Sequence, residues 1–265
     1  MLHPRIIPCL LVQNKGLVKT QKFKDPKYVG DPINAVKIFN EKEVDEMIVL
    51  DIDATTGNRE PDYKMIENLA VECRMPLCYG GGIKKAEQAR RIFGLGVEKV
   101  AISSIVMDDP GIVGRMADQV GRQSVVVVLD VKKRMLGGKY DIWTHNAQKN
   151  TRKDPVEFAR EMERLGAGEI VINSIDNDGM CKGYDLALVD ALRETLTVPM
   201  TVIGGAGSLQ DIGQLIARHG IIGAAAGSLF VFKGVYRAVL INYPNRAEKE
   251  ALINENCNRF SRSGK

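Results

Sequence analysis

The chain has 265 residues, 45% of them hydrophobic and 26% charged, so it can bury a large core and does not have the composition of a disordered protein. This length suits one large α/β domain or two small ones. The formal net charge of +4 comes from interspersed acids and bases, which argues against a nucleic-acid partner and suits a small anionic ligand.

No apolar leader follows Met1, and no run of about 18 apolar residues occurs, so we expect a cytoplasmic protein without a membrane segment. The five cysteines are odd in number and none are spaced CxxC, which predicts reduced thiols. The three histidines lie far apart in the sequence, so we expect no metal site and no cofactor.

Short apolar runs alternate with longer amphipathic stretches along the chain. The runs predict eight buried strands, at residues 6–12, 47–52, 76–79, 100–103, 124–130, 170–173, 200–203 and 222–226. Helical patterns lie between them, as at 62–73, 85–95, 155–165, 185–196 and 210–218. Eight strand–helix units predict a single (β/α)8 TIM barrel, α/β in class, over residues 1–265. An open doubly wound sheet is the alternative, although it usually has about five or six strands.

Three segments fit neither a strand nor a helix by pattern. Residues 13–31 are expected to form a long loop, and residues 132–153 another, in which Gly137-Gly138 suggests a hairpin. Residues 245–265 are expected to form a polar tail with a frayed end.

The two halves of the chain resemble each other, which supports a barrel built from two half-barrels. Residues 78–83 match 202–207, and residues 100–105 match 224–229. By the same repeat, Leu11 at the end of the first strand corresponds to Asp130 at the end of the fifth. We expect these two side chains to face each other across the barrel mouth, so that a site with two carboxylates has lost one of them.

Glycine-rich turns follow the third and seventh predicted strands, at residues 80–82 and 204–207. Glycine lets backbone N–H groups converge on an anion without obstruction by a Cβ atom. One strand later come the small pairs Ser103-Ser104 and Gly227-Ser228, where a helix N-terminus would favour negative charge. Two such sites predict a bis-phosphorylated or otherwise elongated anionic ligand, and the alternative is that the glycines only make tight turns.

Acidic residues at predicted strand ends are the next candidates, namely Asp51, Asp53, Asp130, Asp176 and Asp178. Asp130 ends an otherwise apolar strand, where a carboxylate is costly unless it is paired or functional. The alternative to a functional role is a salt bridge to Lys132 or Lys19. Lys19, in the first long loop, could instead reach a phosphate.

Charged residues of alternating sign precede four strands, namely Arg5, Glu46, Lys99 and Glu169. All parallel strands begin at the same end of a barrel, so we expect these four side chains to meet in a ring that plugs the barrel axis. The alternative is a structural plug in which the charges only satisfy one another.

The chain resembles the cyclase subunit of imidazole glycerol phosphate synthase from Arg5 to about Phe232. The motifs that carry the resemblance are Arg5-Ile6-Ile7-Pro8-Cys9-Leu10, Gly30-Asp31-Pro32, Gly80-Gly81-Gly82-Ile83, Gly166-Ala167-Gly168-Glu169, Ser174-Ile175-Asp176-Asn177-Asp178-Gly179, Gly183-Tyr184-Asp185 and Gly204-Gly205-Ala206-Gly207. The resemblance implies a glutaminase partner that docks on the barrel bottom, and ammonia that crosses the barrel to a bis-phosphorylated ribulosyl carboxamide. It also implies two acid/base aspartates, at the ends of strands 1 and 5.

Carried onto this sequence, the resemblance makes Asp130 one catalytic aspartate and places Leu11 where the other is expected. Arg5, Glu46, Lys99 and Glu169 match the charged quartet that gates ammonia in that family. Ser103 and Asn173 replace other polar residues of the family pattern. The residues that we assign to substrate or phosphate binding are Lys19, Asp51, Gly82, Ser103, Ser104, Asn173, Asp178, Gly179, Gly204, Gly205, Gly227 and Ser228.

The chain is closer still to a divergent branch of that family, which has a similar first strand and segments like those from Leu17 to Phe23 and from Tyr28 to Val36. That branch is associated with the amidation of surface-polysaccharide sugars. The resemblance therefore predicts an ammonia-passing barrel that serves a separate sugar amidotransferase. The alternatives are a true cyclase of histidine biosynthesis, a phosphate-binding activator of the glutaminase without catalysis, and a sugar-phosphate isomerase.

Overall fold

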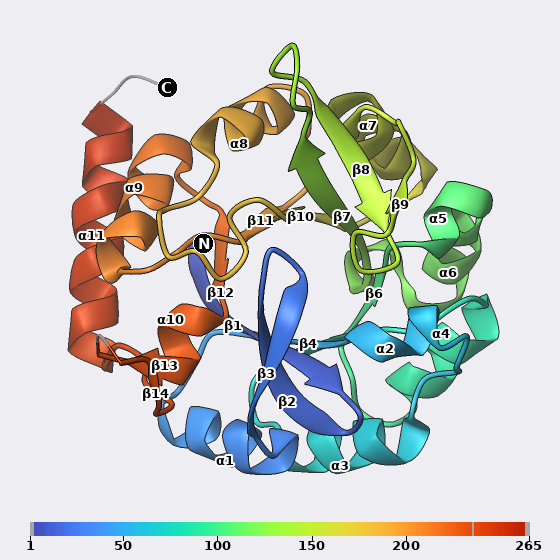
Figure 1. The fold of residues 1–265 in the computed structure, drawn as a ribbon, viewed down its shortest axis with the longest axis horizontal. Helices are drawn as coiled ribbons and strands as arrows, with labels where there is room; N and C mark the ends of the chain where they lie inside the picture. Colours follow the sequence, from blue (N-terminus) through green and yellow to red (C-terminus); the bar gives the residue numbers. More distant parts are fainter. Residues whose placement is uncertain (1–2, 235, 263–265) are drawn as a thin grey trace.

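Residues 3–234 and 236–262 are described by a computed structural model of the chain. Eight parallel strands close into a barrel, because β10 and β7, the first and the last parallel strands in the sheet order, also pair with each other. Figure 1 looks into the barrel and shows the helices in a ring around it. The strands are β1 (Arg5–Gln13), β4 (Met47–Asp51), β5 (Leu77–Gly80), β6 (Lys99–Ile102), β7 (Val125–Lys133), β10 (Glu169–Ser174), β11 (Met200–Ile203) and β12 (Gly223–Ala226).

This closure confirms the predicted TIM barrel and excludes the open doubly wound sheet. All eight predicted strands are present, each within one or two residues of its expected bounds except β7, which runs on to Lys133. Going round the barrel, three strands separate β1 from β7 in either direction. The ends of β1 and β7 therefore lie opposite each other, as the internal repeat predicts.

The outer helices begin where polar side chains accept hydrogen bonds from free N–H groups of the first turn. Asp31, Asp62, Asp154, Asp185 and Ser208 act in this way for α1, α3, α7, α8 and α9. The helices that follow the strands are α1 (Pro32–Glu41), α3 (Tyr63–Glu72), α4 (Ala86–Phe93), α6 (Ile112–Val120), α7 (Pro155–Leu165), α8 (Leu186–Arg193) and α9 (Leu209–His219). Shorter helices, at the strand ends, are α2 (Ile52–Thr56), α5 (Ile105–Asp108) and α10 (Ser228–Val231), and η1 (Arg122–Ser124) precedes β7.

Two separate apolar cores follow from the alternation of side chains along each strand. In β1, Ile6 and Leu10 point outward into the core beneath the helices, whereas Ile7 and Cys9 point into the barrel. The barrel interior is built largely from small and medium side chains. Its buried members are Ile7, Cys9, Ile48, Cys78, Ala101, Val126, Val128, Val171, Ile203 and Ala225.

The segment 13–31 is not the predicted loop but a pair of strands, and this prediction was wrong. β2 (Gly16–Gln21) pairs antiparallel with β1 and with β3 (Lys24–Gly30). In Figure 1 this ribbon lies in front of the barrel opening. The residues of β3 are mostly exposed and polar, so they lack the apolar pattern of a buried strand.

The segment 132–153 holds the predicted hairpin. Gly137 and Gly138 both have positive φ in the turn between β7 and β8 (Tyr140–Thr144), as a tight connection requires. A further short strand, β9 (Lys149–Asn150), pairs with β8.

The segment 245–265 contains a helix, α11 (Arg246–Arg262), in place of the predicted irregular tail. It packs along α9, where Gly213 leaves room for Leu252 and Asn256. A short ribbon of β13 (Phe232–Lys233) and β14 (Ala238–Val239) precedes it. The predicted frayed end includes residues 263–265, which lie outside the described residues. Among the described residues, no helix is both long and apolar enough to cross a membrane.

Candidate active site

A cavity of about 610 Å³ opens at the carboxyl ends of the barrel strands. This is the end where TIM barrels carry their active sites. Every residue that the sequence assigned to substrate or phosphate binding lines this cavity, as do Asp130 and Leu11. The structure thus brings together residues that are spread from position 11 to position 228.

Asp130 and Asn173 form a side-by-side pair at the ends of β7 and β10. They are register partners on these adjacent strands, and Asn173 Nδ2 donates a hydrogen bond of 2.9 Å to Asp130 Oδ1. Burial raises the pKa of Asp130 to about 7, despite the opposing effect of that hydrogen bond. A carboxyl group that titrates near neutrality can give and take a proton, which is the property of a general acid or base.

No salt bridge holds Asp130 within residues 3–234 and 236–262, in contrast to the alternative considered from the sequence. The ammonium group of Lys132 lies 5.0 Å from the centre of the Trp143 ring. Lys19 is buried and donates to the Cys9 carbonyl oxygen at 2.5 Å. The neutralising partner that would explain Asp130 as purely structural is therefore absent from the described residues.

Leu11 faces the same cavity from the opposite wall. It lies beside Leu50 in the register of β1 with β4, and both pack on the apolar interior of the barrel. The cavity therefore has a titrating carboxyl group on one side and a hydrocarbon surface on the other. Leucine cannot transfer a proton, so Asp130 is left without an acidic partner at the symmetry-related position.

The glycine turns adopt conformations that other residues rarely reach. Gly81 and Gly82 have φ of +122° and +72°, and Gly204 and Gly205 have φ of +95° and +114°. A Cβ atom at Gly205 would overlap the Gly183 carbonyl oxygen, so this turn packs directly against another backbone segment. Both the conformation and the close approach restrict this position to glycine.

Short helices of four residues begin at the two small-residue pairs. Ser104 precedes α5, and Gly227 precedes α10, whose first residue is Ser228. Arg237 adds a cation beside the second pair, with Nη2 3.5 Å from Ser228 Oγ. The helix N-termini and this guanidinium group make the wall suitable for an anionic group.

Lys19 lies on β2, between the first strand and this wall. Burial lowers its pKa, although the nearby Cys9 and Asp178 act in the opposite direction. A Cβ atom on Gly227 would touch its ammonium nitrogen, so Lys19 lies directly against the small-residue turn. This position is compatible with contact to a phosphate bound there.

The other acids at the strand ends tie the surrounding loops together. Asp178 accepts hydrogen bonds from Thr20 Oγ1 at 2.7 Å and from the Phe23 N–H at 3.1 Å, which fastens the β2–β3 ribbon to the loop after β10. Asp51 caps α2 through the N–H groups of Asp53 and Ala54. Asp53 holds the turn after β1, and Asp176 accepts from the Lys133 N–H.

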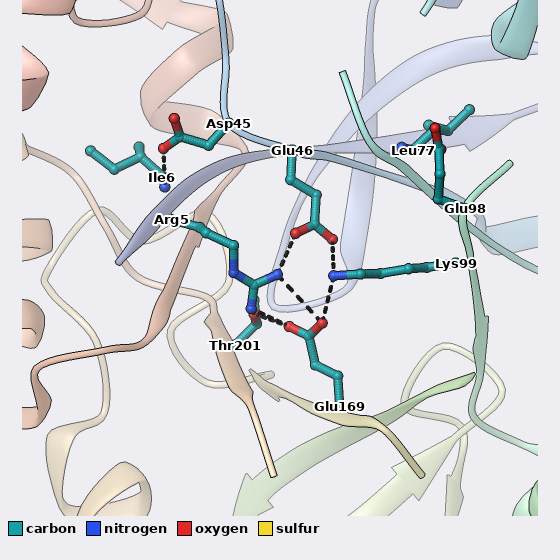
Figure 2. Close-up of polar contacts among 9 residues, drawn as sticks. All are labelled: Arg5, Ile6, Asp45, Glu46, Leu77, Glu98, Lys99, Glu169 and Thr201. Carbon is teal, nitrogen blue, oxygen red and sulfur yellow. Dashed lines mark hydrogen bonds and ion pairs between the residues drawn. The ribbon is translucent and has the colours of Figure 1, made fainter. Parts of the chain in front are cut away.

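The predicted ring of charges is present at the other end of the barrel (Figure 2). Arg5 Nη2 lies 2.7 Å from Glu169 Oε1, and Lys99 Nζ lies 2.7 Å from Glu46 and 2.8 Å from Glu169. Arg5 also bonds directly to Glu46. Burial opposes ionisation of Glu169, but Arg5 and Lys99 outweigh it and lower the pKa to about 2.

His145 and Thr201 are among the cavity and ring residues that were not singled out from the sequence. His145 lines the cavity from the β8–β9 turn, where it and the next two residues have φ near +55°. Thr201 lies inside the ring, with Oγ1 donating to Glu169 Oε1 at 2.5 Å. The sequence carries no pattern for either, since a lone histidine in a loop and a threonine in an apolar strand are both ordinary features.

The comparisons with known proteins agree with this architecture. A histidine biosynthesis protein family matches residues 5–237, and the chain belongs to that family. A Vibrio vulnificus protein, provisionally named imidazole glycerol phosphate synthase subunit hisF3, is 60% identical over 253 residues, which cover 96% of this chain and 97% of that protein.

Further relatives carry similar provisional names. A Leptospira interrogans protein named imidazole glycerol phosphate synthase subunit HisF is 57% identical over 96% of this chain and 100% of its own length. A Pseudomonas aeruginosa protein named as subunit hisF2 is 52% identical over 92% of this chain and 97% of its own length. These comparisons place the chain among the synthase-subunit-like members of the family.

Proposed function

We propose that this chain is the cyclase-type subunit of a glutamine-dependent synthase and that it accepts ammonia from a glutaminase partner. The observation that carries the proposal is the combination of a closed ion-pair ring at the strand starts with an anion-suited cavity at the strand ends of one barrel. The names of the relatives describe subunits of imidazole glycerol phosphate synthase, which supports cyclase chemistry and a partner subunit.

In this proposal the two ends of the barrel have separate tasks. The glutaminase docks on the side of Arg5, Glu46, Lys99 and Glu169, and ammonia passes through the interior to the cavity. The glycine turns and the small-residue pairs bind the two phosphates of a bis-phosphorylated carboxamide. Asp130 transfers the protons that ring closure requires, because its pKa of about 7 suits both directions of transfer.

A second candidate is favoured by one observation, the leucine at position 11. Under this second candidate function, the chain passes ammonia to a separate amidotransferase that modifies a nucleotide-linked sugar. The barrel itself then catalyses no cyclisation. The names of the relatives support the cyclase over this candidate. Leu11 supports the second candidate, since general acid/base catalysis contributes about 10²–10⁴-fold to a rate.

The deciding experiment is turnover of the phosphoribulosyl carboxamide substrate by the purified chain with excess ammonium, followed by its ultraviolet absorbance. Free ammonium makes the partner unnecessary, so the assay isolates the chemistry of the barrel. The cyclase predicts turnover at ordinary enzyme rates and a loss of about 10²–10⁴-fold in Asp130→Asn. A folded chain without turnover would contradict it.

Leu11→Asp is the matched variant for this assay. If the parent chain is inactive and Leu11→Asp gains turnover, the cavity binds the substrate and lacks only the second carboxylate, and the ammonia-supply candidate then stands. Binding of the glutaminase subunit from the same organism, measured by calorimetry, tests the part that both candidates share. Absence of binding would contradict both.

A further inference from the structure

A fifth side chain belongs to the ring of charges at the strand starts. Thr201, the second residue of β11, is 0% exposed. Its hydroxyl donates to Glu169 Oε1 at 2.5 Å and accepts from Arg5 Nη2 at 3.3 Å (Figure 2). The hydroxyl therefore uses its donor and an acceptor position at once, and both partners are charged groups, which form the stronger hydrogen bonds.

The contact between Thr201 and Arg5 crosses a strand. In the sheet order β12 lies between β11 and β1, and Gly223 of β12 is the register partner of both Thr201 and Arg5. A Cβ atom at Gly223 would lie well inside van der Waals distance of Thr201 Oγ1. The absence of a side chain at this one position lets side chains from two non-adjacent strands meet.

Thr201 also makes the ring asymmetric. Glu169 accepts hydrogen bonds from three residues, Arg5, Lys99 and Thr201, whereas Glu46 accepts from Arg5 and Lys99. To separate Arg5 from Glu169, the molecule must also break at least one of the two hydrogen bonds of the bridging hydroxyl. In a buried site these bonds are not readily replaced by water, so the hydroxyl favours the closed arrangement.

We propose that Thr201 is a positioning residue that holds the Arg5–Glu169 pair closed across the barrel entrance. It thereby restricts the passage of small neutral molecules, ammonia among them, until a partner rearranges the ring. The identity of the passing molecule rests on the proposed function, whereas the closure of the ring by Thr201 does not.

The closure is tested on the full chain alone at neutral pH. Nitrogen-15 NMR measures the rate at which the hydrogens of the Arg5 guanidinium group exchange with solvent. Thr201→Val keeps the shape and removes the hydroxyl, and Thr201→Ser keeps the hydroxyl and removes the methyl group. We expect exchange about tenfold faster in Thr201→Val, and near the parent rate in Thr201→Ser. The guanidinium group of Arg218, paired with Asp190 on the surface, should exchange alike in all three proteins.

Unchanged exchange of Arg5 in a folded Thr201→Val, or equal acceleration in Thr201→Ser, would overturn the proposal. If Thr201→Val does not fold, Gly223→Ala displaces the hydroxyl from the other side and should give the same acceleration. An unaccelerated Gly223→Ala would also count against the role of the hydroxyl.

The restriction of passage is tested with the glutaminase partner and the phosphoribulosyl carboxamide substrate, by the ammonia that reaches bulk solvent per glutamine hydrolysed. This ratio should fall in Thr201→Val, because the looser ring admits more of the ammonia to the barrel, and stay at the parent value in Thr201→Ser. A constant ratio despite faster exchange would overturn the restriction of passage. If no glutaminase binds, the proposed function fails, but the exchange measurement still decides whether Thr201 closes the ring.

Discussion

The two ends of the barrel treat buried polar groups in opposite ways. At the strand starts, Arg5, Lys99, Glu46 and Glu169 all find charged partners, and the ring keeps Glu169 ionised. At the strand ends, Asp130 has no ion-pair partner among the described residues, and its pKa rises to about 7. Mutual pairing makes the first end a closed structure, while incomplete pairing leaves the second end with a carboxyl group whose pKa lies near neutrality.

The largest difference should appear when one charge is removed from the closed end. Glu169→Gln removes a buried carboxylate and leaves the partly exposed Arg5 and Lys99 to share Glu46, and breaking a buried pair costs about 3–5 kcal/mol. We expect a loss of that size in the free energy of unfolding, measured with urea. The control is Glu67→Gln, whose exposed pair with Lys64 should contribute less than about 1 kcal/mol. Equal losses in the two variants would contradict the contrast between a closed ring and a surface pair.

The pH dependence of stability should have opposite signs at the two ends. The pKa of Glu169 is lowered in the folded state, so its stabilisation is present above its unfolded pKa of 4.5 and is lost as pH falls toward about 2. The pKa of Asp130 is raised, so between its unfolded value of 3.8 and about 7 the folded state binds more protons, and stability falls as pH rises.

Asp130→Asn should remove the fall in stability that the parent shows as pH rises from 3.8 to about 7. We expect the variant to be more stable than the parent by about 2–4 kcal/mol at pH 8, with a difference that disappears near pH 4. Urea unfolding at a series of pH values measures it. A variant that is less stable than the parent at pH 8 would mean that the carboxylate is paired in solution.

The smallest expected difference in the free energy of unfolding is between the loss of two hydroxyl groups, one at each end of the barrel. Ser103 Oγ at the cavity is buried without a hydrogen-bond partner among the described residues, whereas the Thr201 hydroxyl bonds to two charged groups. Ser103→Ala should therefore change the free energy of unfolding by less than about 1 kcal/mol, and Thr201→Val should lower it by about 1.5–3 kcal/mol. Similar losses from both would indicate that Ser103 is bonded in solution.

The strands could be predicted because a strand buried on both faces is a continuous apolar run with no competing pattern. The β2–β3 ribbon could not be, since β3 is held by backbone pairing at the barrel mouth and exposes most of its side chains. Helix α11 could not be predicted either, because its apolar contacts with the core come from a narrow strip that includes the partly buried Leu252, Ile253 and Cys257. The rest of its sequence is polar and resembles a solvated tail.

The residues of the site also fall into two groups, those that the sequence predicts and those that only the structure reveals. Asp130 could be found because a carboxylate interrupts an apolar strand, and the ring because four charges precede four strands. The pairing of Asp130 with Asn173 depends on the register of β7 with β10, which the sequence does not specify. Thr201 is one more β-branched residue in a strand, and only the three-dimensional neighbourhood distinguishes its hydroxyl from packing.

The bare backbone at Gly223 also constrains how this chain can change over generations. Because a methyl group at 223 would overlap the hydroxyl at 201, an alanine can be accepted there readily only after Thr201 has been replaced by something smaller. The reverse order passes through an unfavourable intermediate sequence. The two positions should therefore be inherited as a pair, and substitutions at them should follow one order more often than the other.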